Sequence, residues 1–323
     1  VDRKKIDFRV STFPTAFGEK VVLRLLDPTV GLRTFDQLGL DGRNRQVVEE
    51  VIDKPFGMIL ISGPTGSGKS TTLYSILKSL NAEEVNIVSL EDPVEYFIEG
   101  VSQSQIRPEI HYTFASGLRS ILRQDPDIIM VGEIRDSETA ELATHAALTG
   151  HIVLSTLHTN NAIGVIPRLS DMGVSNFLLP SALTLAMSQR LVRRLCVECK
   201  KEIVPPPKVA EVIKQEIAAF PVAARSRFKD IDFDHPKVWL APGCKFCAHK
   251  GTKDRIAIFE SLAMTPQLEK IIVGGTTEGK IKEEADRQGM ITLRQDGLVK
   301  MLRGLISFEE LINALGGDKE HNF

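Results

Sequence analysis

The sequence predicts an α/β fold in which helices cover both faces of a parallel β-sheet. Short apolar runs alternate with helical segments along the first half of the chain, and a glycine-rich loop lies between one such run and a helix. The chain has 323 residues, of which 42% are hydrophobic and 25% are charged, as is ordinary for a globular protein. This length indicates roughly two domains of about 150 residues each.

The amino-terminal residues precede this pattern. Residues 8–26 alternate in polarity and indicate two strands joined by a turn at residues 14–18. Residues 27–40 contain Pro28, Gly31 and Gly39 and indicate a linker, and residues 43–52 indicate a helix. The chain begins with Val1 instead of Met and runs directly into strand-like sequence, so we expect it to be part of a longer protein.

A glycine-rich run between an apolar strand at residues 58–61 and a helical stretch at residues 72–77 fits the pattern GxxxxGK[ST]: Gly63, Pro64, Thr65, Gly66, Ser67, Gly68, Lys69, Ser70 and Thr71. A strand, glycine loop and helix in this order direct several backbone N–H groups at one point near the positive end of the helix dipole. Lys69 can reach the β- and γ-phosphates, and the Ser70 hydroxyl can ligate Mg²⁺. We therefore predict nucleotide binding here.

Further apolar runs at residues 85–90, 128–131 and 152–154 predict the other strands. The helix between the last two runs begins near Asp136 and ends at Gly150, with capping residues at both ends. Thr265 and Ser307 begin two helices near the carboxyl terminus, the second with a capping box. This part of the chain is therefore predicted to be helical.

Carboxylates follow two of the predicted strands. ATP hydrolysis requires a carboxylate that positions or deprotonates water at the carboxyl ends of sheet strands. Glu91 and Glu95 follow one run, and Glu133 follows the run at residues 128–131, which resembles a Walker B strand. Gly132 occupies the slot of the usual magnesium-binding Asp, so either Glu133 holds the metal through water, or Glu133 is the base and Ser70 carries the direct contact.

Two histidines and two arginines are less specific signals. His151 precedes the run at residues 152–154 and His158 follows it; a histidine beside a buried strand is more often structural than catalytic. Arg9 and Arg24 lie on the amino-terminal strands, where arginines usually form weak surface ion pairs. An arginine supplied by another domain or subunit can instead offset transition-state charge.

The chain has four cysteines, in two CxxC pairs: Cys196 with Cys199, and Cys244 with Cys247. Two such pairs can complete a tetrahedral sulfur site for zinc, although residues 200–243 exceed the usual spacing of about 15–20 residues and must fold out as an insertion. Disulfides or a redox CxxC are the alternatives, and a reducing cytosol disfavours disulfides. A closed site of four thiolates leaves no position for substrate, so the predicted zinc is structural.

Taken together, these motifs resemble the secretion ATPases of type II secretion and type IV pilus assembly (GspE/PilB-like). The resemblance rests on residues 63–71, 91–95, 113–136 and 150–160, in that order. It implies a RecA-like P-loop NTPase core that forms a homo-hexameric motor. It further implies an Asp box at residues 91–95 containing Glu91, an atypical Walker B motif at Glu133, and a His box containing His151 and His158. Residues 8–12 and 21–24 match the end of the family's second amino-terminal domain, where arginines approach the nucleotide, which assigns this role to Arg9 and Arg24.

The resemblance also implies an organisation and a function. Residues 1–32 would be a remnant of the β-containing second amino-terminal domain, 33–195 the ATPase core, 196–250 the zinc subdomain, and 251–323 a helical region. The expected function is ATP hydrolysis, with Mg²⁺ and structural Zn²⁺, that powers pilus or pseudopilus assembly with platform proteins at the cytoplasmic face of the inner membrane. Pilus retraction ATPases lack the zinc subdomain, so retraction is not expected.

Composition bears on the competing functions. A net charge of −2 and 6% aromatic residues argue against a nucleic-acid motor, so we expect no nucleic-acid partner. A non-catalytic nucleotide switch remains a further alternative. No apolar stretch approaches the ~20 residues of a membrane span.

Overall fold

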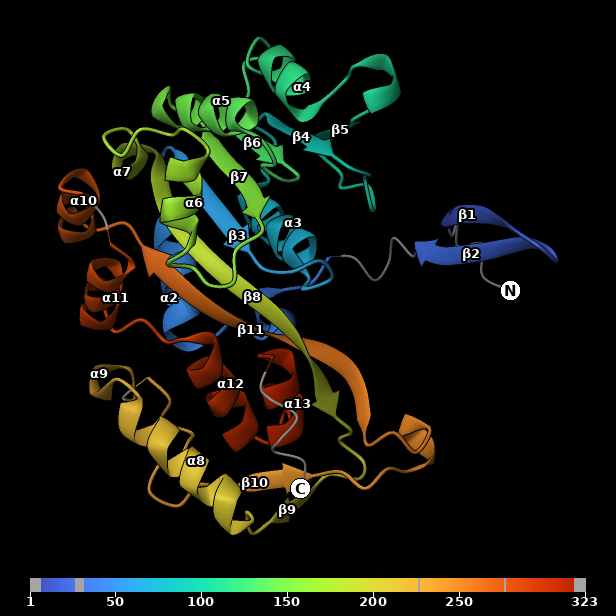
Figure 1. The fold of residues 1–323 in the computed structure, drawn as a ribbon, viewed down its shortest axis with the longest axis vertical. Coiled ribbons are helices and arrows are strands. Elements are labelled where there is room, and N and C mark those ends of the chain that lie inside the picture. The colour runs from blue at the N-terminus through green and yellow to red at the C-terminus, as the bar shows by residue number, and fades with distance from the viewer. Residues whose placement is uncertain (1–6, 27–31, 226, 276, 317–323) are drawn as a thin grey trace.

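The computed structural model describes residues 7–26, 32–225, 227–275 and 277–316. Its centre is a seven-stranded sheet in the order β11-β8-β3-β7-β6-β4-β5 (Figure 1). All neighbouring strands pair in parallel except β11, which is antiparallel to β8. The strands are β3 (Gly57–Ser62), β4 (Ile87–Glu91), β5 (Val101–Gln105), β6 (Ile128–Val131), β7 (Ile152–Leu157), β8 (Leu183–Leu195) and β11 (Thr252–Ala263).

Helices bury both faces of the sheet, as a parallel sheet requires. One core joins the sheet to α1 (Phe35–Leu38), α2 (Gly42–Ile52) and α3 (Lys69–Leu80). The core on the other face joins it to α4 (Phe114–Ile121), α5 (Ser137–Leu148), α6 (Val165–Asp171), α7 (Leu179–Ala182), α10 (Pro266–Val273) and α11 (Glu278–Arg287). The predicted α/β fold is therefore confirmed.

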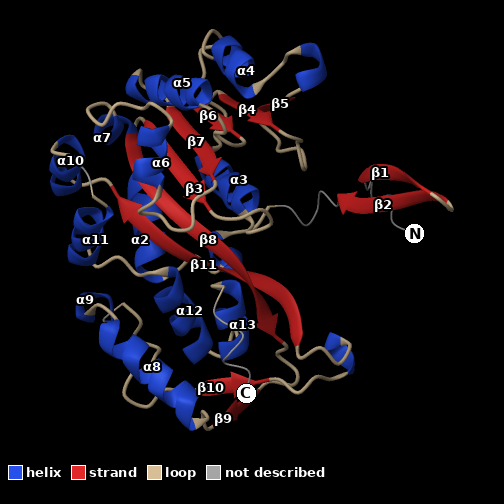
Figure 2. Cartoon of the chain, viewed as in Figure 1, coloured by secondary structure: helices blue, strands red, loops and turns tan. Residues whose placement is uncertain are grey.

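A third core lies where β8 and β11 extend beyond the rest of the sheet (Figure 2). It is formed by α8 (Pro207–Ala219), α9 (Val222–Arg225) and β10 (Val238–Leu240) with α12 (Leu293–Leu302) and α13 (Phe308–Ala314). β10 pairs with β9 (Lys201–Ile203). The insertion between the two cysteine pairs thus packs its own apolar residues against the carboxyl-terminal helices.

The amino-terminal strands β1 (Asp7–Thr15) and β2 (Gly18–Leu26) form an antiparallel hairpin that lies apart from the central sheet (Figure 1). The two predicted strands are confirmed. The predicted linker is only partly tested, because residues 27–31 lie outside the described residues, and residues 35–38 form α1, capped by Thr34. Two 3₁₀ turns, η1 (Pro108–Ile110) and η2 (Lys245–Cys247), complete the fold.

The region 251–323 departs from its prediction. It begins with β11, a twelve-residue strand that forms the edge of the central sheet. Helices α10 and α13 begin at the expected caps, Thr265 and Ser307. At Ser307 the structure contains only half of the predicted capping box, since the cap side chain accepts from Glu310 N–H without a reciprocal bond. Within the described residues, no helix is both long enough and apolar enough to cross a membrane.

Candidate functional site

The glycine-rich loop connects β3 to α3, as predicted. Gly63, Gly66 and Gly68 all have positive φ angles, of 145°, 78° and 86°, which favour glycine. A Cβ on Gly63 would lie 2.5 Å from the carbonyl oxygen of Gln189, so the close approach of the β8 backbone also requires glycine there. The loop therefore has the tight, open backbone that can surround a phosphate group.

Gln189 of β8 holds this loop and the start of α3 through two side-chain hydrogen bonds. Its side chain is buried, and its Nε2 donates to the carbonyl oxygen of Ser67 at 2.8 Å. Its Oε1 accepts from the Thr72 hydroxyl at 2.8 Å. Gln189 was not predicted from the sequence, because it is separated from Ser67 by 122 positions and belongs to none of the motifs.

The Lys69 ammonium bonds to the loop itself. Its Nζ donates to the carbonyl oxygens of Gly63 and Pro64, at 2.8 and 3.2 Å. Burial lowers the pKa of Lys69, and the nearby Glu133 opposes this effect. The ammonium therefore has a local partner that an anionic ligand can replace.

A cavity of about 1030 Å³ opens between the loop and the carboxyl ends of β4, β6 and β7. This volume is at the upper end of the range for small-molecule sites, about 300–1,000 Å³. Its lining brings together residues that the sequence analysis singled out: Thr65, Gly66, Ser67, Gly68, Lys69, Ser70, Thr71, Glu91, Glu95, Glu133, His158 and Arg9. Arg33 of the segment before α1 also lines it and was not predicted.

Glu133 follows β6 and lies between two cationic or proton-donating partners. Its Oε1 accepts from the Arg135 guanidinium, and its Oε2 lies 3.2 Å from His158 Nε2. Arg135 also lies 3.2 Å from Asp92 Oδ2. Partial burial acts to raise the pKa of Glu133, but Arg135 and His158 outweigh burial and hold that pKa below its usual value.

Glu91, at the end of β4, has a different environment. It is only 3% exposed. One carboxylate oxygen accepts from the Tyr74 hydroxyl, and the other accepts from Ser89 Oγ at 2.6 Å and Gln103 Nε2 at 2.9 Å. Burial and the adjacent carboxylate raise the pKa of Tyr74, which keeps the phenol protonated as a donor. Both oxygens of Glu91 are thus engaged by neutral groups.

The histidines separate into two environments. His158 follows β7 and lies in the cavity, but His151 lies at the opposite end of that strand. The His151 Nδ1 is 2.8 Å from the carbonyl oxygen of Ala146 and 3.3 Å from the Thr149 hydroxyl, at the end of α5. His151 therefore lies away from the cavity that His158 lines, because parallel strands present their carboxyl ends to the site, and its role stays a prediction.

Arg9 and Arg24 are paired across the hairpin. Arg9 lines the cavity, whereas the Arg24 side chain lies outside what the structure describes. The hairpin thus brings at least one predicted arginine to the nucleotide cavity.

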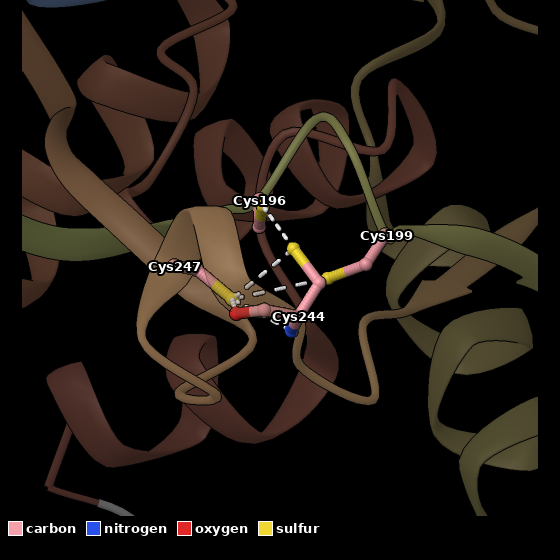
Figure 3. Close-up of side chains that lie close together, drawn as sticks. All are labelled: Cys196, Cys199, Cys244 and Cys247. Carbon is pink, nitrogen blue, oxygen red and sulfur yellow. Dashed lines mark hydrogen bonds between the residues drawn. The ribbon is translucent and has the colours of Figure 1, made fainter.

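The four cysteines form one cluster (Figure 3). The Sγ of Cys244 lies 3.8 Å from that of Cys247 and 3.9 Å from that of Cys196, and Cys199 Sγ lies 4.0 Å from Cys247 Sγ. Four sulfurs around one ion at about 2.3 Å would be separated by about 3.8 Å. The Cys244 N–H donates to Cys247 Sγ and lowers the pKa of that thiol to about 6. All four thiols are free, so the cluster fits a tetrahedral metal ion.

Comparisons with known proteins agree with this geometry. The family described as type II/IV secretion system protein matches residues 1–313. The type IV pilus assembly ATPase PilB of Myxococcus xanthus is 45% identical over 318 residues, which cover 98% of this chain and 54% of that protein. The type II secretion system protein E of Aeromonas hydrophila is 44% identical over 315 residues, which cover 98% of this chain and 60% of that protein.

A solved structure of the pilus retraction motor PilT with bound ADP has a TM-score of 0.67 at 28% identity, covering 95% of this chain and 73% of that one. The chain spans about half the length of the two curated relatives described above. The extent of the family match and the identity to these relatives show that the chain belongs to the type II/IV secretion system protein family.

Proposed function

We propose that this chain is the motor part of an ATPase that powers the assembly of a pilus or pseudopilus. The observation that carries the proposal is the cavity in which Lys69 of the phosphate loop and the carboxylate of Glu133 face one another. Relatives at 45% and 44% identity bear the names of a pilus assembly ATPase and a type II secretion protein. A loop for phosphates and a carboxylate for water are the parts that nucleotide hydrolysis needs.

The phosphate loop binds the triphosphate of ATP through its backbone N–H groups and the positive end of α3. Lys69 leaves the carbonyl oxygens of Gly63 and Pro64 and binds the β- and γ-phosphates. The Ser70 hydroxyl, at the first turn of α3, is the side chain that would hold Mg²⁺. When bound, Mg²⁺ neutralises charge on the phosphates.

Glu133 is the better candidate for the general base. Its carboxylate is 19% exposed and contacts the cavity, so a water molecule can approach it. Glu91 is buried, and three donors use its oxygens, so it fits a role in holding α3, β4 and β5 together beside the site. His158, which contacts Glu133, is placed to orient it or to respond to the γ-phosphate.

Other subunits and domains complete the proposed site. Arg9 and Arg24 would approach the nucleotide from the amino-terminal domain, of which residues 1–32 are the final part. A homo-hexamer, inner-membrane platform proteins as partners, and a position at the cytoplasmic face of that membrane follow from the family and are part of this proposal. We also propose residues 33–195 as the ATPase core, to which β11 adds an edge strand.

The cysteine cluster is proposed to hold a structural zinc ion. It lies directly beyond β8, and the N–H of Cys196 donates to the carbonyl oxygen of Gly251 at 2.9 Å. A metal there would tie the end of β8 to the segment that leads into β11. Residues 196–250 would then fold as a zinc subdomain, with residues 251–323 as the carboxyl-terminal region.

The test is release of phosphate from ATP, measured per subunit over a wide range of protein concentration. A rate that rises with concentration and is lost in Lys69→Ala supports a site completed between subunits. No turnover at any concentration, with normal ATP binding, would support the nucleotide switch instead. Stimulation by single-stranded DNA would support a nucleic-acid motor.

A further inference from the structure

Arg135 occupies a central position in the cavity that none of the predicted roles explains. It follows Glu133 by two residues, and its Nη2 contacts both Glu133 Oε1 and Asp92 Oδ2, the second at 3.2 Å. Its guanidinium carbon lies 5.9 Å from the centre of the Phe114 ring. The guanidinium therefore connects the carboxyl ends of β4 and β6, the two strands that carry the acidic residues.

This contact conflicts with the proposed role of Glu133. A general base needs a free lone pair within hydrogen-bond reach of the water that it deprotonates. Each oxygen of Glu133 already has one partner, Oε1 on Arg135 and Oε2 on His158. Arg135 also stabilises the ionised carboxylate and so makes it a weaker base. Release of Arg135 would therefore make Glu133 a stronger base and leave Oε1 fully open to water.

Arg135 is the partner with the freedom and the chemistry to leave. Its side chain is 55% exposed and lines the same cavity as Lys69. A γ-phosphate carries more negative charge than a carboxylate, and the fork of a guanidinium matches phosphate oxygens in bidentate geometry. The phosphate of bound ATP would lie next to Glu133 and would compete directly for this guanidinium.

We propose that Arg135 is a catalytic residue with two positions: paired with Glu133 and Asp92 in the absence of nucleotide, and bound to the γ-phosphate when ATP is present. Its transfer frees Glu133 Oε1. Water then gives a proton to that oxygen and bonds to the γ-phosphorus, and ADP departs with the electron pair of the broken P–O bond. This inference rests on the proposed ATPase function.

Nucleotide affinity tests the contact without requiring hydrolysis. We would measure the Kd values of a non-hydrolysable ATP analogue and of ADP for the full chain and for Arg135→Gln. Loss of one charge-assisted contact with the γ-phosphate should weaken binding of the analogue by about 10- to 100-fold and leave ADP nearly unchanged. Arg135→Lys keeps the charge but loses the bidentate fork, so its Kd for the analogue should lie between those of the unsubstituted chain and Arg135→Gln.

The matched control is Arg119→Gln. Arg119 is also 55% exposed and also pairs with a glutamate, Glu138, but it is outside the residues that line the cavity. Its substitution should change neither Kd. Equal weakening of both nucleotides in Arg135→Gln, or none, would overturn the proposal.

Chemical rescue separates this inference from the function on which it rests. Guanidinium chloride at millimolar concentration should restore part of the turnover of Arg135→Ala and should not stimulate Arg119→Ala. If the unsubstituted chain hydrolyses ATP and Arg135→Ala equals it in turnover, the inference fails and the ATPase function stands. If the unsubstituted chain has no turnover, the ATPase function fails. The γ-phosphate contact is still supported in that case if Arg135→Gln weakens binding of the analogue but not of ADP.

Discussion

Substitution of Glu91 or Glu133 by glutamine should distinguish the roles of the two carboxylates, because one variant should lose thermal stability and the other should lose turnover. In Glu91→Gln, the amide oxygen can keep the bonds from Ser89 and Gln103, and the amide nitrogen must face the Tyr74 hydroxyl. The variant therefore loses charge on two bonds and loses the bond that Tyr74 donates, and the Tyr74 oxygen already accepts from Glu95 N–H. Bonds to charged groups exceed neutral bonds by about 1 kcal/mol each, and removal of a buried charge offsets part of this, so the expected loss is about 1–3 kcal/mol.

For a chain of this size, each kcal/mol lowers Tm by about 1.5 °C, so Glu91→Gln should lower Tm by roughly 2–5 °C. Its turnover, measured below that transition, should fall only modestly. Glu133→Gln should show the reverse, with a loss of turnover of about 10²- to 10⁴-fold and little change in Tm, because its partners are exposed to solvent. Calorimetry and phosphate release on the same preparations measure both quantities.

The reasoning would be refuted if Glu91→Gln abolished turnover with an unchanged Tm while Glu133→Gln remained active. Tyr74→Phe is an internal check. It removes one donor to Glu91 without changing any acidic residue. It should reproduce the loss of Tm and leave turnover close to that of the unsubstituted chain.

Three further predictions concern the parts around the site. Gln189→Leu removes two buried hydrogen bonds under the phosphate loop and should weaken ATP binding by about 10-fold or more, measured by calorimetric titration; unchanged affinity would contradict the supporting role. Elemental analysis should find one zinc per chain, and Cys247→Ser should lose it together with part of the thermal stability; a metal-free, equally stable chain would disprove the zinc site. Lys300→Met leaves Asp296 buried without its cation and should cost about 3–5 kcal/mol in urea unfolding, whereas a loss below 1 kcal/mol would show that the pair is dispensable.

The parts of this protein that could be predicted from sequence are those whose signal is local. The phosphate loop, the strand before Glu133 and the caps of α5, α10 and α13 each depend on residues within about ten positions of one another. The CxxC pairs are also local, and the zinc interpretation predicted that they would meet. Each of these predictions was confirmed in position, although the roles of the residues remain proposals.

The parts that could not be predicted depend on contacts between distant segments. β8 was missed because it carries arginines and a glutamine among its apolar residues, which obscures the strand pattern. β11 was missed because the region 251–323 was predicted to be helical. The contact of Gln189 with the phosphate loop and the contact of Gln103 with Glu91 are visible only once the sheet is assembled. The position of His151 away from the cavity could not be predicted either, because a strand pattern does not say which end of the strand faces the site.

The course of β8 bears on how hydrolysis could produce movement. This strand carries Gln189, which holds the phosphate loop, and ends at Leu195, one residue before the cysteine cluster. Leu195 N–H donates to the carbonyl oxygen of Leu305, just beyond α12. A change in the loop on nucleotide binding therefore acts on one end of a continuous strand whose other end is bound to the cysteine cluster and the carboxyl-terminal helices. From Gln189 to Leu195 this strand pairs with β11 alone, so displacement at Gln189 would pass to the cysteine cluster through the two-stranded β8–β11 ribbon.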